Sequence, residues 1–375
     1  MEDQALGFEE IRPYVDAEVP QVMAEVTQRQ TFALLMGYLY PDTPPSTIAE
    51  QMSAVKSVEE FQHTYISHAV LKIVKESISE LSHSGFEDLD PNQSYLFISN
   101  HRDIILDSAL LNLIRYELGH PTTLIAIGDN LLITPLITDL MKLNKSFIVH
   151  RNPPRTQAYA YSLRLAKFIQ QRITQDGESV WLAQRNGRTK DGVDQTQPSL
   201  LKMLQLAFED KTLAEGFRDL RIVPMAISYE LEPCDYLKAE ELVCRESGKG
   251  YDKNDREAII KGIRDPKGRV HLAAGQPLDR EIMAIPDSQT RNDWLKALAN
   301  EIDKAIFSLY HRWPIQYVAH DLLHDSSAYQ AKYTDDDIAQ FQQHLKRQLG
   351  KSEFSAEAMR EMILRIYSGM IPNAQ

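Results

Sequence analysis

Apolar side chains recur at helical spacing near the start of the chain. Two pairs lie four positions apart, Val22 with Val26 and Leu35 with Leu39, and a later face carries Phe61, Tyr65, Ala69 and Ile73. The tandem prolines at 44–45 break this pattern, and Ser57 with Glu60 three residues later is a capping-box signature. We therefore expect helices from about 18 to 81, which form a helical N-terminal domain over residues 1–90.

A different pattern follows, in which short apolar runs alternate with helical stretches. The runs typical of buried strands are residues 95–98, 123–127, 146–149, 179–182, 221–229 and 269–273. Helical spacing covers residues 106–118 and 157–173, and Pro198 suits the first turn of a helix that reaches Phe208. Strands that alternate with helices form α/β sheets. We expect a mixed, largely parallel sheet flanked by helices over residues 91–285.

The pattern becomes helical again towards the C-terminus. One helical face is marked by Leu295, Leu298, Ile302, Ile306 and Leu309. Two more helices are expected at about 335–349 and 355–367. Residues 286–375 are therefore predicted to form a helical C-terminal extension of an α/β protein.

The overall charge limits the partners of the chain. Its 375 residues carry a formal net charge of -12. Nucleic acid is not expected as a partner, because contacts with phosphates need a positive surface. A small anionic substrate would need a pocket built from a few placed Arg and Lys side chains.

Cysteine content and apolar segments bear on the compartment. Two cysteines are too few for a disulfide framework, which fits a reducing compartment. The acidic start MEDQALGFEE lacks an apolar core, so no signal peptide is expected. No stretch approaches the roughly 20 apolar residues that span a bilayer. We expect a cytoplasmic protein, and one that acts on lipids would meet the membrane from outside.

The segment from Ser99 to Ser108 carries the most informative chemistry. His101 directly follows a predicted strand, and ligands of open α/β sheets bind at the carboxyl ends of strands. A carboxylate beside a histidine fixes its tautomer and leaves the other ring nitrogen free as a general base. Asp103 and Asp107 compete for that orienting role. An equally common arrangement is a surface loop whose aspartate caps the next helix.

Basic residues follow two later predicted strands. Arg151 comes after residues 146–149, where an arginine can bind phosphate bidentately, although most such arginines are solvated or paired. The loop at 184–192 contains two glycines and concentrates charge in an acidic chain through Arg185, Arg188 and Lys190. An anion site is favoured there over a polar hairpin or crossover loop.

Two apolar segments have mainly structural interpretations. Pro224 lies inside a strand-like run, where proline typically marks an edge strand, a strand start or a bulge. Residues 131–137 form an apolar run that fits a buried core segment, with an acyl tunnel or a membrane-facing surface as alternatives.

Together these segments resemble the glycerol-3-phosphate and lysophosphatidic acid acyltransferase superfamily over about residues 95–280, as a divergent bacterial-type member. The four blocks that carry the resemblance are Asn100-His101 with Asp107, Phe147-Ile148 with Arg151, Gly187-Arg188-Thr189-Lys190-Asp191-Gly192, and Val223-Pro224. Two features depart from the family pattern. Five residues rather than four separate His101 from Asp107, and Arg185 occupies the position of a usual glutamate.

The resemblance implies direct transfer of a fatty acyl group from a thioester of coenzyme A or acyl carrier protein. The acceptor would be a hydroxyl of glycerol-3-phosphate or a lysophospholipid such as lysophosphatidate, in glycerophospholipid synthesis at the inner membrane face. The implied roles are His101 as general base, Asp107 or Asp103 as its orienting acid, Asn100 and Thr189 in oxyanion stabilisation or positioning, and Arg151, Arg188, Lys190 and Arg185 as ligands of the acceptor phosphate. No metal or cofactor is implied.

Three rival functions have distinct signatures. A lipid hydrolase would use water in place of the acceptor, but no Gly-x-Ser-x-Gly nucleophile elbow is present. A non-catalytic lipid-binding protein would not need His101. A metal site from His101, Asp103 and His150 lacks compact ligand spacing.

Overall fold

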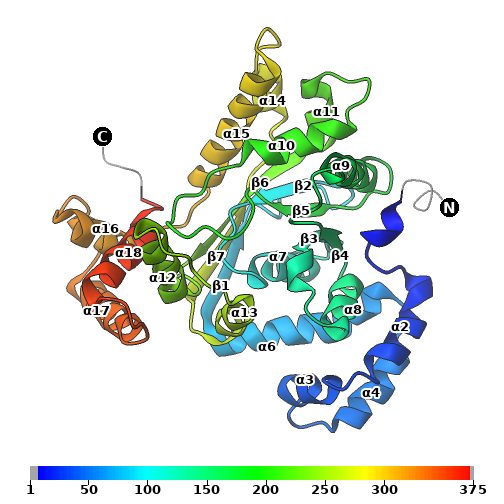
Figure 1. Ribbon diagram of the computed structural model, residues 1–375, viewed down its shortest axis with the longest axis horizontal. Coiled ribbons are helices and arrows are strands. Elements are labelled where there is room, and N and C mark those ends of the chain that lie inside the picture. The colour runs from blue at the N-terminus through cyan, green and yellow to red at the C-terminus, as the bar shows by residue number, and fades with distance from the viewer. Residues whose placement is uncertain (1–6, 372–375) are drawn as a thin grey trace.

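A seven-stranded sheet runs through the middle of the protein (Figure 1). The computed structural model describes residues 7–371. The strands, in sheet order, are β1 (Ile78–Ser84), β7 (Gly268–Ala274), β6 (Ile222–Tyr229), β2 (Leu96–Ser99), β5 (Val180–Ala183), β3 (Leu124–Gly128) and β4 (Ser146–Val149). All neighbours are parallel except β6 and β7. The predicted mixed, largely parallel α/β sheet is therefore confirmed.

Strand β2 lies at the centre of the sheet and places its following loop among others. Its last residue, Ser99, is in register with Ala183 of β5 and with Met225 of β6. Because parallel strands end at the same edge, the loops after β2, β3, β4 and β5 meet there. This edge collects the segments that the sequence analysis singled out.

Two apolar layers cover the faces of the sheet. One layer packs α9 (Ala158–Thr174), α10 (Pro198–Leu204) and α15 (Arg291–Ser308) on side chains such as Leu96, Ile98 and Leu182. The other packs α6 (Ser67–Ser77) and α7 (Leu106–Glu117) on side chains such as Phe97 and Val223. Neighbouring residues of β2 point to opposite faces, so both faces of this short central strand are buried.

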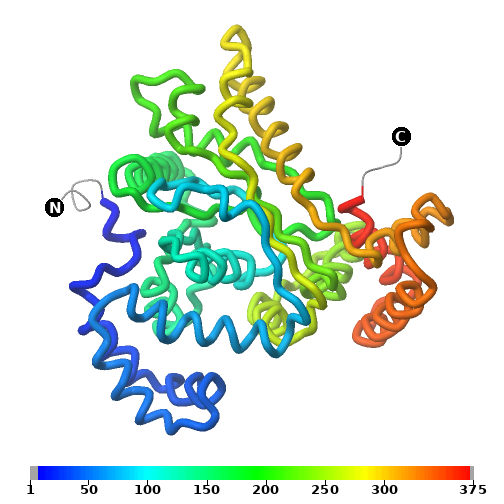
Figure 2. The backbone as a smooth tube through the Cα atoms, turned by 180° about the vertical axis from the view of Figure 1, so that it is seen from behind, coloured from blue at the N-terminus to red at the C-terminus, as the bar shows by residue number. Residues whose placement is uncertain are grey.

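Helical segments lie at opposite sides of the sheet, as both views show (Figures 1 and 2). The N-terminal set contains α2 (Val19–Val26), α3 (Phe32–Leu39), α4 (Pro45–Ser53), α5 (Val58–Phe61) and the π-helical turn η3 (Gln62–Ile66) before α6. The C-terminal set contains α16 (Pro314–His324), α17 (Asp335–Leu349) and α18 (Ala356–Ser368). The C-terminal helices share a core with α12 (Asp235–Glu246). The limits of the three predicted domains stay predictions, and their residues 1–6 and 372–375 lie outside the described part.

One strand was wrongly predicted as helix. The expected helix to residue 81 ends at Ser77, and Ile78 adopts extended dihedral angles of φ -119° and ψ 124°. Residues 78–84 form β1 and pair with β7, which lies about 190 residues further along the chain. Local periodicity cannot reveal a strand partner at that separation. The Ser57 cap is confirmed, because its side chain accepts a hydrogen bond from the Glu60 amide.

Several helices after β3 were not predicted. They are α8 (Pro135–Leu143), α11 (Leu213–Asp219), α12, α13 (Asp255–Arg264) and α14 (Asp279–Ala284). They contain 6 to 12 residues each, so helical spacing extends over only two to three turns in most of them.

Pro224 occupies an unexpected place inside a central strand. It is the third residue of β6, which pairs with β2 on one side and β7 on the other. The carbonyl of Pro224 accepts a hydrogen bond from Gly275, just beyond the end of β7. The N–H that proline lacks would point to the same side, where the β6–β7 ladder has already ended. No ladder bond is lost, so neither an edge strand nor a bulge is needed.

Candidate active site

His101 and Asp107 form a buried pair at the carboxyl end of β2. The ring Nδ1 of His101 lies 2.8 Å from Asp107 Oδ2. His101 is 9% exposed and Asp107 is fully buried. The edge of the imidazole also faces the Trp181 ring, with centroids 5.8 Å apart. Among the described residues, Nε2 of His101 has no hydrogen-bond partner. A carboxylate therefore fixes one ring nitrogen and the other is free.

Asp103 and Asp107 have different partners. Oδ2 of Asp107 also accepts the backbone amides of Arg102 and Asp103, at 2.6 and 3.1 Å. Oδ1 of Asp103 accepts the amides of Ile105 and Leu106 at the first turn of α7. Asp103 thus caps the helix, and Asp107 from the same helix turns back to the histidine. The extra residue between His101 and Asp107 is accommodated in this capped turn.

A cavity of about 400 Å³ opens beside His101. Its apolar wall consists of Val149, Leu165, Leu182, Leu200 and Met203. Its polar rim includes Arg151 after β4, and Arg185 with Asn186 after β5. The cavity therefore offers one basic nitrogen, two guanidinium groups and an apolar surface in one place.

The four cations that were expected to share one site line two separate hollows. Arg151 and Arg185 line the His101 cavity, and within residues 7–371 neither forms an ion pair with a carboxylate. Arg188 and Lys190 line a separate, much smaller hollow beside α12. The structure therefore places the four cations in two groups and not around one cavity. The loop turns at Gly187, where φ is +77°, so the side chains before and after it point to different places.

Burial lowers the pKa of two of these cationic groups. Partial burial lowers the pKa of Arg151, although Asp255 and Asp129 oppose the effect. Burial and the neighbouring Arg188 lower the pKa of Lys190 to about 8, although Lys190 lies 3.2 Å from Glu241. Lys190 is thus partly neutral near pH 8 and already paired, so it is a weaker anion ligand than Arg151.

Comparison with known proteins identifies the part of the chain that contains this site. Residues 80–228 match the protein-family model described as Acyltransferase. The match runs from β1 to β6 and includes all four motif segments, which confirms the family resemblance inferred from them.

The comparisons with solved structures and with curated proteins give weaker similarity or none. A similar solved structure is the 1-acyl-sn-glycerophosphate (LPA) acyltransferase PlsC from Thermotoga maritima, at 10% sequence identity and a TM-score of 0.39. The alignment covers 79% of this chain and 98% of that chain. A search of curated proteins found no significant match. Among residues 7–371, no helix is both long and apolar enough to cross a membrane.

Asn100 and Thr189 hold the loops around His101 together. The Asn100 side chain exchanges two hydrogen bonds with the backbone of Ile227 in β6, at 2.8 and 2.9 Å. The Thr189 amide donates to the His101 carbonyl at 2.8 Å, and its hydroxyl bonds to Asp194. The Asn100 side chain and the Thr189 amide are thus already engaged. These contacts fit the positioning role, and an oxyanion role for backbone N–H groups near Asn100 stays a prediction.

Arg102 was missed by the sequence analysis, although it follows His101 directly. It is 1% exposed, and its guanidinium lies 2.5 Å from Asp194 and 3.5 Å from Glu232. Lys238 of α12 lies 2.5 Å from Glu232 and donates to the Arg102 carbonyl. This buried ionic cluster joins the loop after β2 to the loop after β5 and to α12. A lone arginine in a sequence gives no sign of such distant partners.

One other sequence-based interpretation changes. Residues 131–137 do not line the His101 cavity, and Ile133 is 56% exposed, so the run is neither an acyl tunnel at this site nor a fully buried core segment. In the described part of the chain, no three His, Cys, Asp or Glu side chains gather as metal ligands.

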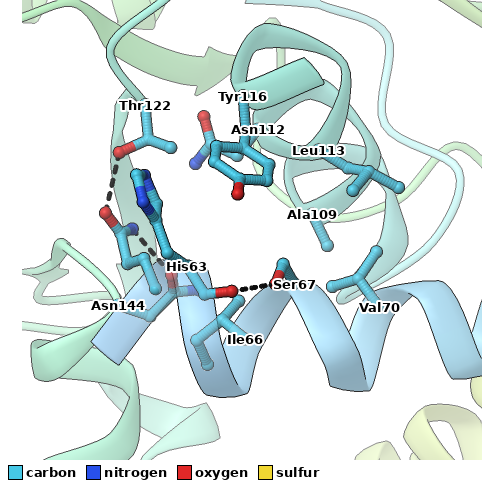
Figure 3. Close-up of a pocket in the computed structure, with 11 residues that line it drawn as sticks. His63, Ile66, Ser67, Val70, Ala109, Asn112, Leu113, Tyr116, Thr122 and Asn144 are labelled. Atoms are coloured by element: carbon cyan, nitrogen blue, oxygen red, sulfur yellow. Dashed lines mark hydrogen bonds between the residues drawn. The ribbon is translucent and has the colours of Figure 1, made fainter. Parts of the chain in front are cut away.

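A small hollow of about 30 Å³ between η3, α6 and α7 shares no lining residue with the His101 cavity (Figure 3). The rings of His63 and Tyr116 pack there with centroids 4.4 Å apart. The Gln62 side chain donates to Asn144 and accepts from Thr122. These polar groups satisfy one another, so the hollow reflects helix packing.

Proposed function

We propose that this protein transfers a fatty acyl group from a thioester to a hydroxyl of an anionic glycerolipid acceptor, such as glycerol-3-phosphate or lysophosphatidate. One observation carries the proposal. The free Nε2 side of His101, two unpaired guanidinium groups and an apolar wall share a single cavity of about 400 Å³ in an acyltransferase-family domain. Each part matches one requirement of acyl transfer to a charged acceptor.

His101 acts as general base in the proposed mechanism. Its Nε2 removes the proton of the acceptor hydroxyl, and the oxygen attacks the carbonyl carbon of the thioester. The tetrahedral intermediate collapses with release of the thiolate, which takes the proton from His101. Asp107 keeps Nδ1 protonated and stabilises the imidazolium that forms. No acyl-enzyme and no metal ion take part.

Arg151 and Arg185 bind the phosphate of the acceptor in this proposal. Neither has a carboxylate partner within residues 7–371, and Arg151 is half-buried, so an incoming anion meets guanidinium groups that are free to pair. Arg188 and Lys190 are not part of this phosphate site.

The apolar wall of the cavity receives the acyl chain. Side chains of β4, α9, β5 and α10 form a continuous set of aliphatic neighbours next to His101. The donor carries its acyl group on coenzyme A or acyl carrier protein, and the enzyme contacts the membrane from one side to reach lipid acceptors.

Product analysis with and without an acceptor tests the reaction. The protein is incubated with a long-chain acyl-CoA or acyl carrier protein donor and a panel of acceptors. We expect acylated acceptor as the main product, and a loss of about a hundredfold or more in turnover for His101→Ala with unchanged melting. Free fatty acid formed at the same rate without any acceptor would instead identify a hydrolase.

A buried glycine allows a separate test of the phosphate site. A Cβ added at Gly128, at the end of β3, would lie 2.5 Å from Nε of Arg151 and 2.5 Å from Oδ1 of Asn130. Gly128 has an ordinary φ of -70°, so alanine fits the backbone there. Gly128→Ala should displace Arg151 and raise the KM for a phosphate-bearing acceptor roughly tenfold or more.

The matched control is Gly250→Ala, because no atom lies within 4 Å of the Cβ position at Gly250. Arg151→Ala should reproduce the effect of Gly128→Ala. An unchanged acceptor KM with a raised donor KM in both variants would reassign Arg151 to the phosphates of the donor.

A further inference from the structure

Asp107 has a second side-chain partner on the far side from His101. The phenol of Tyr229, the last residue of β6, donates a hydrogen bond to Asp107 Oδ1 at 2.8 Å. Tyr229 is 1% exposed. Oδ2 of Asp107 is shared by His101 and two backbone amides, and the phenol is the partner recorded for Oδ1 within residues 7–371.

We propose that Tyr229 is a positioning residue that stabilises the ionised form of Asp107, and so sets the pH below which the His101–Asp107 pair loses its function as a base. This inference rests on the proposed function, because it concerns the same general base. Tyr229 does not touch the cavity, and acts only through Asp107.

The backbone that carries the phenol is bonded on both sides of the strand. The carbonyl of Tyr229 accepts a hydrogen bond from the side chain of Gln316 at 3.1 Å, and Gln316 is fully buried at the start of α16. On its other side, the strand pairs with Val270 of β7. Burial and the nearby Asp107 raise the pKa of Tyr229 well above its ordinary value, so the phenol keeps its proton and remains a donor.

Removal of the hydroxyl has a defined electrostatic consequence. In Tyr229→Phe, Oδ1 of Asp107 would be a buried carboxylate oxygen without a donor. Such an oxygen disfavours the ionised carboxylate and binds a proton, or a protonated imidazole, more strongly. The His101–Asp107 pair should therefore take up its first proton at a higher pH than in the wild type.

Other charged groups surround the pair and are the same in every variant. They are Arg102 and Asp103 on the same loop, Glu232 and Lys238 near α12, and Arg151, Arg185 and His150 around the cavity. Their common contribution cancels when variants are compared with the wild type.

Two pH titrations test the proposal. The first is kcat/KM for acyl transfer against pH. The second is the ring signal of His101 in protein with ¹³C-labelled histidine, assigned by comparison with His101→Ala. In Tyr229→Phe the acidic limb of the activity profile and the His101 signal should both move to higher pH by about one unit, since one hydrogen bond to a charged group changes an equilibrium about tenfold. On the alkaline plateau the activity should return to within about threefold of the wild type, because two backbone amides still hold Asp107.

Tyr367→Phe is the matched control. Tyr367 is also 1% exposed and also donates to a buried carboxylate, that of Asp235, at 2.9 Å. Its loss should lower stability at least as much, because its hydroxyl also accepts a hydrogen bond from the Glu232 amide, and should leave both titrations in place. A second probe should shift the titrations in the opposite direction. 3-Fluorotyrosine at position 229 is a stronger hydrogen-bond donor than tyrosine, so it should move both curves to lower pH. This probe also serves if Tyr229→Phe does not fold.

Each outcome decides between specific alternatives. A uniform fall in activity with unmoved curves in both position-229 proteins would overturn the proposal and leave Tyr229 a structural role. If the wild type transfers no acyl group, the proposed function fails, but the His101 titration still decides the effect of Tyr229. In an Asp107→Asn background, Tyr229→Phe should add less than about a twofold change, because it acts through the carboxylate.

Discussion

Two neighbouring aspartates at this site have different structural roles. Asp107 accepts from His101, whereas Asp103 accepts from the first amides of α7. Asp103 lies on the loop and Asp107 lies four residues later in the first turn of α7, so sequence position alone does not decide which of them orients the histidine. The direction of each side chain separates them.

We expect Asp107→Asn to lose about a hundredfold or more in turnover, because an amide does not stabilise the imidazolium and can impose the wrong tautomer. Asp103→Asn should keep most of the activity, since an amide oxygen still caps α7, and should change stability by no more than about 1 kcal/mol. Steady-state kinetics and urea unfolding of both variants check this. The reverse order of severity would assign the orienting role to Asp103.

A glycine on α13 depends on the same loop. A Cβ added at Gly262 would overlap with Oδ2 of Asp103, whereas nothing lies within 4 Å of the Cβ position at Gly37 in α3. Alanine normally stabilises a helix by about 1 kcal/mol over glycine. Gly37→Ala should therefore raise the melting temperature, and Gly262→Ala should lower it and reduce activity. If Gly37→Ala and Gly262→Ala raise the melting temperature equally, the loop around Asp103 moves to accommodate the added methyl group without loss of stability.

At the scale of elements, helix α3 is the part that best fits contact with a membrane. Residues 31–40 contain no charged side chain, and Leu34 is 79% exposed. α3 and α4 lie at the outer end of the N-terminal helices, away from the sheet (Figure 1). The net charge of -12 argues against attachment by bulk electrostatics, so apolar contact is the expected mode.

We expect Leu34→Glu to weaken binding to lipid vesicles roughly tenfold, because burying one leucine side chain is worth about 1.5–3 kcal/mol. Met283→Glu on α14, where Met283 is 56% exposed, is the matched substitution at another exposed apolar site and should bind as the wild type does. Vesicle flotation with neutral and anionic lipids measures both. Equal binding by the two variants would exclude α3 as the contact.

At the scale of the whole molecule, buried polar groups connect the sheet and its loops to the C-terminal helices. Glu232 pairs with Arg102 of the loop after β2, and its amide donates to the Tyr367 hydroxyl of α18. Gln316 of α16 bonds to the backbone of β6. Because these links are buried, we expect the C-terminal helices to unfold together with the sheet.

Arg102→Met should lower the free energy of unfolding by about 3–5 kcal/mol, since it leaves Asp194 and Glu232 buried without their partner. Arg365→Met removes an ion pair with Glu246 whose side chains are 42% and 50% exposed, and should cost less than about 1 kcal/mol. Chemical denaturation followed by fluorescence and circular dichroism should give a single transition for the wild type. Two separated transitions would mean that the extension folds independently.

The sequence by itself determined the α/β class, six of the seven strands and the edge of the sheet where the site lies. These properties follow from local patterns. Apolar runs with turn signals mark strands, and the carboxyl ends of parallel strands meet at one edge, so His101, Arg151 and Arg185 were expected near one another.

Only the tertiary structure decided which side chains meet. It paired Asp107 rather than Asp103 with His101, and it placed Arg188 and Lys190 outside the cavity. It also formed β1 from a segment predicted as helix, and it brought Tyr229 to Asp107 from a strand more than a hundred residues away. The physical reason is the same in each case. Side-chain direction and long-range pairing depend on how elements pack, and a pattern of polar and apolar positions along the chain records neither.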